Sequence, residues 1–392
     1  MLPLAGITVV AVEQAVAAPF ATRQLADLGA RVIKIERPGV GDFARSYDTT
    51  VRGMSSHFVW LNRSKESLTL DLKEAEAIGV LGTLLRRADV FIHNLAPGAM
   101  ARLGFASAEV RREHPRLVVC EVSGYGSTGP YRDKKAYDLL VQSEAAVLSV
   151  TGTLDAPAKV GISVADISAG MYAFSSVLAA LLYREKTGEG ASLEVSLFDS
   201  LAEWMSYPMY YAYGGTPPPR SGARHAVIAP YGPYTAGDGN VVYLGLQNER
   251  EWNRFCAQVI GRPEMASDER FSSNPRRVEH RDELDAAITD AFRGLTADQV
   301  IERLEAAQIA SARMNTVEGL IAHPQLEARD RWRDVDSPAG TVRMLKPPFN
   351  FERMDVPMGP IPSVGEHTDA ILGALGYSAE RIEALRRSRA IS

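Results

Sequence analysis

The chain opens with two strand patterns around a helix pattern, written as Ile7-Thr-Val-Val-Ala-Val12, Pro19-Phe-Ala-Thr-Arg-Gln-Leu-Ala-Asp-Leu28 and Arg31-Val-Ile-Lys-Ile35. Short runs of β-branched and apolar residues predict buried strands, and the longer mixed stretch between them predicts a helix. Strands that alternate with helices in this way are typical of βαβ units in a parallel sheet. We therefore predict an α/β fold from this segment.

The same alternation continues along the chain. Strands are predicted at Leu68–Leu72, Val90–His93 and Leu117–Val122, with a helix at Glu74–Arg87 and a short helix that Ser107 caps. Right-handed crossovers between parallel strands place helices on both faces of the sheet.

A long helix rich in small residues is predicted from Asp166 to Arg184, followed by a strand at Ala191–Leu197. Phe198–Tyr213 reads as helical and aromatic, and the three prolines within Gly214–Arg220 end that pattern. The later predicted elements are a strand at Val241–Leu246, helices at Glu249–Ile260, Asp282–Phe292 and Ala297–Ala307, a strand at Thr341–Leu345 and a helical tail at His367–Arg387. Thr296 and Gln299 form a capping box for the third of these helices.

A chain of 392 residues exceeds the size at which one hydrophobic core usually stops growing, so two domains are expected. We predict a large domain with a Rossmann-like parallel sheet and a smaller α+β domain. The expected boundaries are residues 1–200 for the first part of the large domain, 201–224 for a linker, 225–320 for the small domain, and 321–392 for a linker and the return to the large domain.

Composition excludes several classes of protein. A formal net charge of −5 argues against a nucleic-acid partner and against a polybasic membrane surface. We expect no transmembrane segment, because no charge-free apolar run reaches about 20 residues, and Met1–Val12 carries no export signal. Cys120 and Cys256 have no ligand spacing, so neither a metal site nor a disulfide is predicted, and a cytoplasmic location fits best.

A glycine motif, Gly124-Tyr-Gly-Ser-Thr-Gly129, has the spacing of a dinucleotide-binding loop and follows a predicted strand. That loop normally opens a helix whose amino end holds the phosphates. Here Pro130 and the residues after it leave no clean helix start, and the first strand leads into residues 13–19 without a glycine. An NAD-dependent oxidoreductase is therefore an alternative that only this motif favours, and a loop beside a site is the better interpretation.

Basic residues follow several strands: Arg37, Lys73 and Lys134–Lys135, with Arg102 a little beyond Asn94-Leu-Ala-Pro-Gly98. Ligands of open α/β sheets bind beyond the carboxyl ends of the strands, so these cations can converge on an anionic ligand. Solvated surface charges would give the same pattern, and the residues alone do not decide between the two.

Asp166 stands between the apolar segment Val160–Ala165 and the long small-residue helix. One interpretation is a helix N-cap, which Asp fills well. The other is a carboxylate nucleophile, ionised at neutral pH and able to attack an activated carbonyl.

Four stretches, taken in order, resemble the class III (family III) CoA-transferases, which include succinyl-CoA-dependent dicarboxylate and formyl-CoA transferases. They are Ala18–Thr22 with Asp27–Arg37, then Leu68–Lys73, then Asn94–Gly104, and finally Ser123–Gly126 with Tyr137-Asp138 and Val164–Asp166. The resemblance covers nearly the whole chain, and it implies an interlocked homodimer.

The resemblance implies that Asp166 is the nucleophile that carries the acyl group and then CoA. It places Tyr137 beside the reacting thioester, and around the CoA nucleotide it places Arg37, Lys73, Asn94, Leu95, Arg102 and Lys135. Guanidinium and ammonium groups bind phosphates through charge-assisted hydrogen bonds, which suits the cations of this set. The implied partners are an acyl-CoA and a free carboxylic acid, with coenzyme A as part of the substrate and no separate cofactor.

The acceptor is expected to be a short dicarboxylic acid, such as itaconate or a malate-like acid, with succinyl-CoA as donor. Arg45, Arg224 and His225 are the groups expected to bind its second carboxylate, because a guanidinium binds a carboxylate bidentately. The chain departs from its relatives at Val16, where some of them carry a side-chain amide; Gln14 is nearby. A 2-methylacyl-CoA racemase of the same fold is a second alternative, but similar racemases carry a histidine where this chain has Tyr137.

Overall fold

The computed structural model describes every residue from Met1 to Ser392, and the chain forms two compact units. Unit 1 comprises residues 1–145, 160–205 and 326–392, and unit 2 comprises residues 146–159 and 206–325. Each unit has a hydrophobic core of its own.

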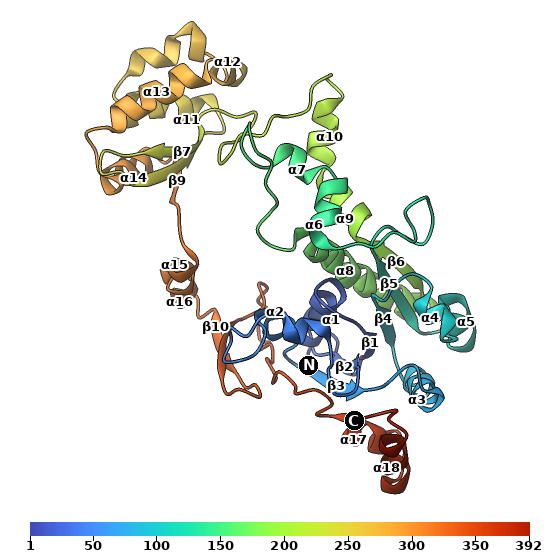
Figure 1. Cartoon of the computed structure of the whole chain (residues 1–392). Helices are drawn as coiled ribbons and strands as arrows, with labels where there is room; N and C mark the ends of the chain where they lie inside the picture. Colours follow the sequence, from blue (N-terminus) through green and yellow to red (C-terminus); the bar gives the residue numbers. More distant parts are fainter. The chain divides into compact units, whose positions relative to one another are not determined.

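Unit 1 is built on a six-stranded sheet in which neighbouring strands are parallel (Figure 1). The strands are β1 (Thr8–Val12), β2 (Arg31–Glu36), β3 (Lys65–Thr69), β4 (Val90–His93), β5 (Val118–Ser123) and β6 (Ser192–Ser196). Their order, β3-β2-β1-β4-β5-β6, is that of a doubly wound Rossmann-like sheet, as the sequence predicts. The order reverses between β1 and β4, and the crevice beyond the carboxyl ends of those two strands is where such sheets bind ligands.

Helices cover both faces of this sheet. On one face, α1 (Ala17–Asp27) packs along α8 (Val164–Thr187), which also contacts α9 (Leu197–Trp204), β5 and β6. On the other face, strand residues such as Val10 and Phe91 share a core with α3 (Ala75–Leu85), α5 (Ser107–Glu113), α17 (Thr368–Ala374) and α18 (Ala379–Arg387). The remaining elements of this unit are η1 (Phe43–Ser46), α2 (Ser56–Leu61), α4 (Ala99–Arg102), α6 (Asp138–Glu144), β10 (Trp332–Val335) and β11 (Val342–Leu345).

Helix α8 is long and apolar enough, by length and composition, to cross a membrane. The helix contains Asp166, Arg184, Glu185 and Lys186, so it is not a charge-free run of about 20 residues, and the expectation based on such runs is not contradicted. Its packing against α1, α9, β5 and β6 is that of a helix in the core of the unit. Met171, Leu182 and Tyr183 remain exposed on it. The homodimer that the resemblance implies stays a prediction, and exposed apolar side chains of this kind suit it.

Unit 2 is a small α+β body. Its antiparallel sheet has the order β7-β8-β9, and the buried side chains of α11, α13 and α14 complete its core. Its elements are α7 (Val147–Val150), α10 (Ser206–Ala212), β7 (Tyr231–Thr235), β8 (Val241–Gly245), α11 (Glu249–Arg254), η2 (Phe255–Val259), η3 (Pro263–Ser267), η4 (Glu269–Phe271), α12 (Asn274–Glu279), α13 (Arg281–Phe292), α14 (Ala297–Ala306), β9 (Ala310–Arg313) and α15 (Val317–Ile321). Helix α16 (Pro324–Ala328) spans the boundary between the two units in the sequence. The capping box of Thr296 and Gln299 is confirmed at the start of α14.

Residues 146–159 belong to unit 2, although they precede α8 in the chain. The reason is a set of backbone contacts: Gly152 accepts a hydrogen bond from the Gly222 amide, and the Arg220 guanidinium donates to the carbonyls of Thr153 and Leu154. Such long-range pairing leaves no local sequence pattern.

Ser107 is another difference from the sequence expectation. It is the first residue of α5 rather than its cap, and its hydroxyl donates to Glu121 on β5 instead of to the helix.

Candidate active site

The loop after β1 lies at the reversal of the strand order, and its backbone is held from both sides. The Gln14 amide donates to Asn94 Oδ1 at 2.9 Å, and Asn94 Nδ2 donates to the Gln14 carbonyl at 2.8 Å. On the other side the Ala15 amide donates to Asp42 Oδ1 at 3.2 Å. The carboxyl ends of β1 and β4 and the segment after β2 are thereby joined at one edge of the sheet.

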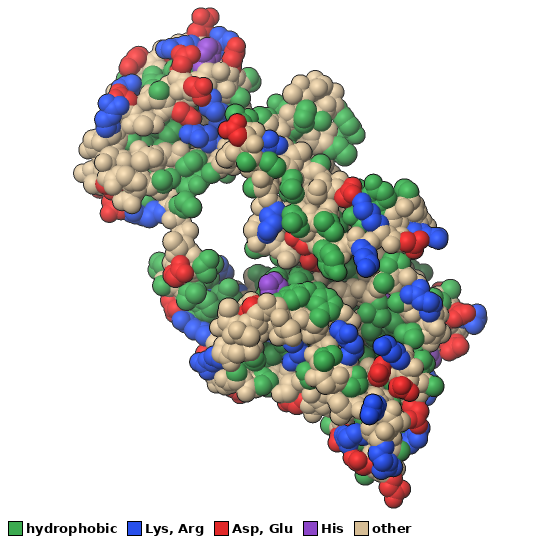
Figure 2. Space-filling view, viewed as in Figure 1, with side chains coloured by type: hydrophobic (Ala, Val, Ile, Leu, Met, Phe, Trp, Pro, Cys, Tyr) green, Lys and Arg blue, Asp and Glu red, His purple; other side chains and the backbone are tan.

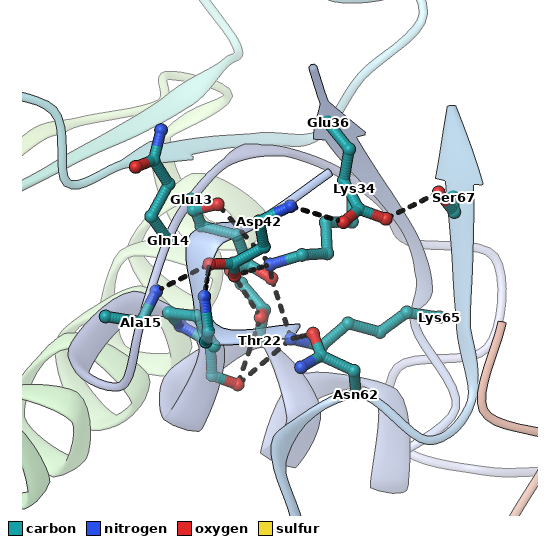
Figure 3. Close-up of polar contacts among 12 residues, drawn as sticks. Glu13, Gln14, Ala15, Thr22, Lys34, Glu36, Asp42, Asn62, Lys65 and Ser67 are labelled. Atoms are coloured by element: carbon teal, nitrogen blue, oxygen red, sulfur yellow. Dashed lines mark hydrogen bonds and ion pairs between the residues drawn. The ribbon is translucent and has the colours of Figure 1, made fainter. Parts of the chain in front are cut away.

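Charged side chains buried beneath this loop form a closed network (Figure 3). The Glu13 carboxylate lies 2.7 Å from Lys65 Nζ and 3.4 Å from Lys34 Nζ, and it accepts a hydrogen bond from Thr22. Lys34 Nζ also contacts Asp42 Oδ2 at 2.8 Å. Burial acts to raise the pKa of Glu13, but the two ammonium groups outweigh it and hold the pKa below its ordinary value. Burial lowers the pKa of Lys65 to about 8.

A second ion pair borders the network. Glu36 accepts two hydrogen bonds from the Arg45 guanidinium, each 2.8 Å long, one from the Ser67 hydroxyl and one from the Asp42 amide. Burial acts to raise the pKa of Glu36, but these donors lower it to about 2.

Asp166 lies in the first turn of α8, which begins two residues earlier at Val164. It is therefore not the N-cap, which is Ser163, and Ser163 makes no capping hydrogen bond with its side chain. The cap comes from α6: Asp138 Oδ1 accepts the Ala165 amide at 2.9 Å, and Asp138 Oδ2 accepts from Gln142 at 2.7 Å. The capping role considered for Asp166 thus falls to Asp138.

The packing of α8 on α1 places Asp166 at the same edge of the sheet as the loop after β1. Gly170 approaches the start of α1 so closely that a Cβ atom there would lie 2.7 Å from the Ala17 carbonyl oxygen. Both helices run back from the carboxyl edge of the sheet, and residues four apart lie on the same side of a helix. Asp166 lies one turn before Gly170, toward the edge of the sheet where the loop after β1 also lies.

Two tyrosines share this neighbourhood. Burial raises the pKa of Tyr47 to about 12, and the carboxylates of Asp42 and Asp166 add to the shift, with a smaller contribution from Tyr137. Tyr47 therefore lies within electrostatic reach of all three residues. Tyr137 immediately precedes α6, and its side chain is 68% exposed, so the phenol is open to a ligand.

The Asp166 carboxylate has no ion pair and no hydrogen bond in the structure. Burial raises its pKa to about 7, and the negative charge of Asp138 adds to this shift. An acid that is desolvated next to a like charge and lacks a cation is typical of a functional carboxylate rather than of a structural one.

The glycine motif forms a loop and not a dinucleotide site. After β5 the chain makes turns and reaches the next helix, α6, only at Asp138. Gly124 is required because a Cβ atom would lie 2.3 Å from Ala136 Cβ. The Ser127 hydroxyl donates to Glu194 on β6, which fixes the loop to the edge strand.

Four of the predicted CoA-binding cations are exposed and form no ion pair: Arg37, Lys73, Arg102 and Lys135. Leu95 is half-buried and packs on the core of unit 1. Both the oxygen and the nitrogen of the Asn94 carboxamide hydrogen-bond the Gln14 backbone, so in the unliganded chain this side chain holds the loop after β1. Lys and Arg alternate with Asp and Glu over the visible face of unit 1, and no uniform basic patch covers it (Figure 2).

Arg45 differs from its predicted role. The sequence suggests a free counter-ion for a substrate carboxylate, but the guanidinium binds Glu36 bidentately and stacks 3.6 Å from the ring centre of Phe58. It also donates to the Pro362 carbonyl. We therefore withdraw Arg45 as a substrate ligand, because its hydrogen-bonding groups serve the scaffold.

Arg224 and His225 belong to unit 2. Arg224 Nε donates to Asp285 at 3.0 Å, and Tyr234 donates to the same carboxylate at 2.7 Å. The terminal nitrogens of Arg224 make no hydrogen bond. His225 stacks on Tyr231 with the ring centres 5.2 Å apart.

The sequence analysis does not name Asp42 or Tyr47, and it includes Asp138 only within a stretch that carries the resemblance, without giving it a role. One signal for the network was present: Lys34 stands inside a strand whose other residues predict burial, and a buried lysine requires an anionic partner. No local pattern marks Tyr47 or shows that Asp138 caps α8, because both relations to Asp166 depend on tertiary packing, such as that of α6 on α8. No group of His, Cys, Asp and Glu side chains suited to a metal ion is present.

A cavity of about 360 Å³ lies elsewhere, at the amino ends of β2 and β3. It is lined by Gly29, Ala30, Lys65, Glu66 and residues from 357–367. Asp166 does not line it, so its size does not identify the reaction centre.

The chain matches the family model described as CoA-transferase family III over residues 4–368. An acyl-CoA transferase of Fusarium pseudograminearum is 34% identical over 97% of this chain and 86% of its own length. The succinate–glutarate CoA-transferase of Agrobacterium fabrum is 33% identical over 95% of this chain and 96% of its own length.

Among solved structures, a CAIB/BAIF family protein from Brucella suis aligns with a TM-score of 0.82 and 31% identity, covering 95% of this chain and 99% of that one. Sequence and fold agree over almost the full length, and this chain belongs to CoA-transferase family III as an enzyme of that family.

Proposed function

We propose that the enzyme transfers CoA from an acyl-CoA to a free carboxylic acid through covalent intermediates on Asp166. The observation that carries the proposal is the state of this carboxylate: it stands at the carboxyl edge of a doubly wound sheet, half-buried, with a raised pKa and no cation or donor to neutralise it. A carboxylate is a nucleophile when it is ionised and not engaged by other groups.

The covalent steps balance without a metal or a nucleoside triphosphate. An Asp166 oxygen attacks the thioester carbonyl, the carbon–sulfur bond breaks, and the CoA thiolate leaves behind an aspartyl–acyl anhydride. The thiolate then attacks the aspartyl carbonyl and releases the donor acid, which gives an aspartyl-CoA thioester. The acceptor carboxylate attacks this thioester, and the freed thiolate takes the acceptor acyl group and restores Asp166. Exclusion of water protects both activated intermediates.

A short dicarboxylic acid is the acceptor we propose, with succinyl-CoA as donor. The support is twofold. The Agrobacterium relative is named for succinate and glutarate, both dicarboxylic acids. The Nε atom of Arg224 donates to Asp285, and its two terminal nitrogens make no hydrogen bond. These two nitrogens are therefore available to bind a carboxylate.

Replacement of Asp166 by Ala is expected to lower CoA exchange by at least about a thousandfold, because this carboxylate is both the attacking group and the CoA carrier. Hydroxylamine added after acyl-CoA should modify residue 166 of the wild type, as read by peptide mass spectrometry. Asp282→Ala, also in the first turn of a helix, is the matched control and should retain activity. Substantial exchange by the Asp166→Ala enzyme would overturn the assignment.

The raised pKa of Asp166 predicts an acid limit to activity. Below about pH 7 the carboxylate takes up its proton, so kcat/KM for acyl-CoA should fall about tenfold per pH unit. Asp138→Asn keeps an oxygen to accept the Ala165 amide but removes the neighbouring charge, so the pKa of Asp166 decreases and the acid limb should move to lower pH. Asp133→Asn, an exposed acid nearby, is the control. An acid limb that stays in place in Asp138→Asn would contradict this explanation.

The raised pKa of Asp166 also makes the free energy of unfolding depend on pH. The folded state holds the Asp166 proton up to about pH 7, whereas the unfolded chain releases it near 3.8, so this group's contribution to stability is full below 3.8 and is lost as the pH rises to 7. Asp166→Asn, which stays uncharged, should therefore be more stable than the wild type at pH 8 and show a smaller difference at pH 4.

Charge reversal at Arg37 or Arg102 is expected to raise the KM for acyl-CoA about tenfold or more while the KM for the free acid changes less than about threefold, because lost phosphate contacts affect only the nucleotide. The salt dependence of the acyl-CoA KM should weaken as well. Arg112→Glu, an exposed arginine in the last turn of α5, is the control. Equal effects on both substrates would place Arg37 and Arg102 outside the CoA site.

A panel of itaconate, malate, mesaconate, oxalate and butyrate tests the acceptor class. We expect kcat/KM for the preferred four- or five-carbon dicarboxylate to exceed that for butyrate at least about a hundredfold, because a monocarboxylate leaves the counter-ion unpaired. Arg224→Ala should reduce this preference, and Arg250→Ala, exposed on α11, should not. Faster turnover of butyrate, or a preference that survives Arg224→Ala, would refute this part of the proposal.

A further inference from the structure

Ala15 has a left-handed backbone, with φ 61°, in the loop after β1. This region is unfavourable for residues other than glycine, because Cβ crowds the backbone. The flanking peptide of Gln14 is held by Asn94. The hydrogen bond that holds Ala15 itself runs from its amide to Asp42 Oδ1.

Asp42 is rigidly placed for this contact. Its second oxygen lies 2.8 Å from Lys34 Nζ, whose side chain is fully buried, and its own amide donates to Glu36. Oδ1 also accepts the Ala44 amide at 2.9 Å, which caps η1. Lys34 is fixed in turn by Glu13, as Figure 3 shows. The aspartate therefore cannot turn away from the loop without breaking a buried ion pair.

The loop after β1 and Asp166 lie at the same edge of the sheet, because α1 and α8 pack together there. Gly170 fits against the Ala17 carbonyl, and Asp166 lies one turn earlier in α8. Tyr47, which follows η1 directly, is influenced by the charges of both Asp42 and Asp166. A shift of Asp42 would consequently affect the backbone of Ala15 and the start of η1, which Tyr47 follows.

We propose that Asp42, held by Lys34, is a positioning residue for catalysis, because it keeps Ala15 in its left-handed conformation and so sets the shape of the loop after β1, at the edge of the sheet where Asp166 lies. This inference rests on the proposed function of Asp166. Asp42 does not touch the reacting atoms. Its effect passes through the backbone of residues 14–16, where a displacement of about 1 Å from the productive geometry can cost about a hundredfold in rate.

Asp42→Asn is the central test. Asparagine keeps an oxygen for the Ala15 and Ala44 amides but turns an amino group toward the Lys34 ammonium, so the side chain has to move. We expect kcat for CoA exchange to fall about 10- to 100-fold and KM for acyl-CoA to change less than about threefold. Hydrogen–deuterium exchange of a peptide spanning residues 13–20 should become faster, and this readout does not depend on activity.

Ala15→Gly in the Asp42→Asn background is the rescue. Glycine adopts positive φ without strain, so the loop needs less support from Asp42, and kcat should recover at least about threefold relative to Asp42→Asn alone. Ala15→Val in an otherwise wild-type chain should lower kcat, since a β-branched residue disfavours this backbone, and this variant leaves the ion pairs intact.

Asp27→Asn is the matched control. Asp27 is a buried aspartate on α1 with two arginine partners, Arg23 and Arg63, and it lies away from the loop. The Asp27→Asn variant should have a lower melting temperature. It should show neither the selective fall in kcat nor the faster hydrogen–deuterium exchange of residues 13–20. The proposal is overturned if Asp42→Asn keeps kcat within twofold of the wild type, if Ala15→Gly gives no rescue, or if Asp27→Asn shows the same kinetic profile. If the wild type shows no CoA exchange, the proposed function is refuted instead. Hydrogen–deuterium exchange of residues 13–20 would still test whether Asp42 holds the loop.

Discussion

The contact between the Glu13 carboxylate and two buried ammonium groups, those of Lys34 and Lys65, is the constraint on which the rest of unit 1 depends. Each group comes from a different strand or strand end: Glu13 follows β1, Lys34 lies in β2 and Lys65 begins β3. Ions removed from water in this way are tolerated only when they are paired, and loss of one partner typically costs about 3–5 kcal/mol. The three strands therefore meet in one register, with the loop after β1 held above them.

The network also connects the sheet to the helices. Lys65 donates to the Pro19 carbonyl in the first turn of α1 and to the Asn62 side chain at the end of α2. Asp42 caps η1 and accepts a hydrogen bond from the Ala15 amide. One set of buried charges thus orients the first helix, the segment after β2 and the loop at the reversal of the strand order.

Asp166 belongs to the same unit, but unlike the carboxylates of the buried network it has no cationic partner. The scaffold carboxylates of Glu13, Glu36 and Asp42 each have a cation, while Asp166 has none and lies near the negative charge of Asp138. The raised pKa of Asp166 reflects the free-energy cost of a carboxylate charge that has no cationic partner. In a covalent mechanism this cost disappears when the carboxylate becomes an uncharged anhydride or thioester. The exposed cations Arg37, Lys73, Arg102 and Lys135, which have no protein anion, suit a large phosphorylated ligand at the same edge of the sheet.

The sequence by itself determined the α/β class and the parallel sheet, and it singled out Asp166 as the candidate nucleophile, a role that stays a prediction. Strand and helix periods are local properties, and the residues around Asp166 carry the resemblance to the family. Tertiary structure alone decided that Asp138, and not Asp166, caps α8, that Arg45 serves Glu36, and that residues 146–159 join unit 2. Each of these depends on which residue, far away in the chain, lies next to a buried charge or an unpaired backbone amide in the folded structure. Hydrogen bonding between residues far apart in the chain leaves no period in the sequence, so only the folded structure reveals it.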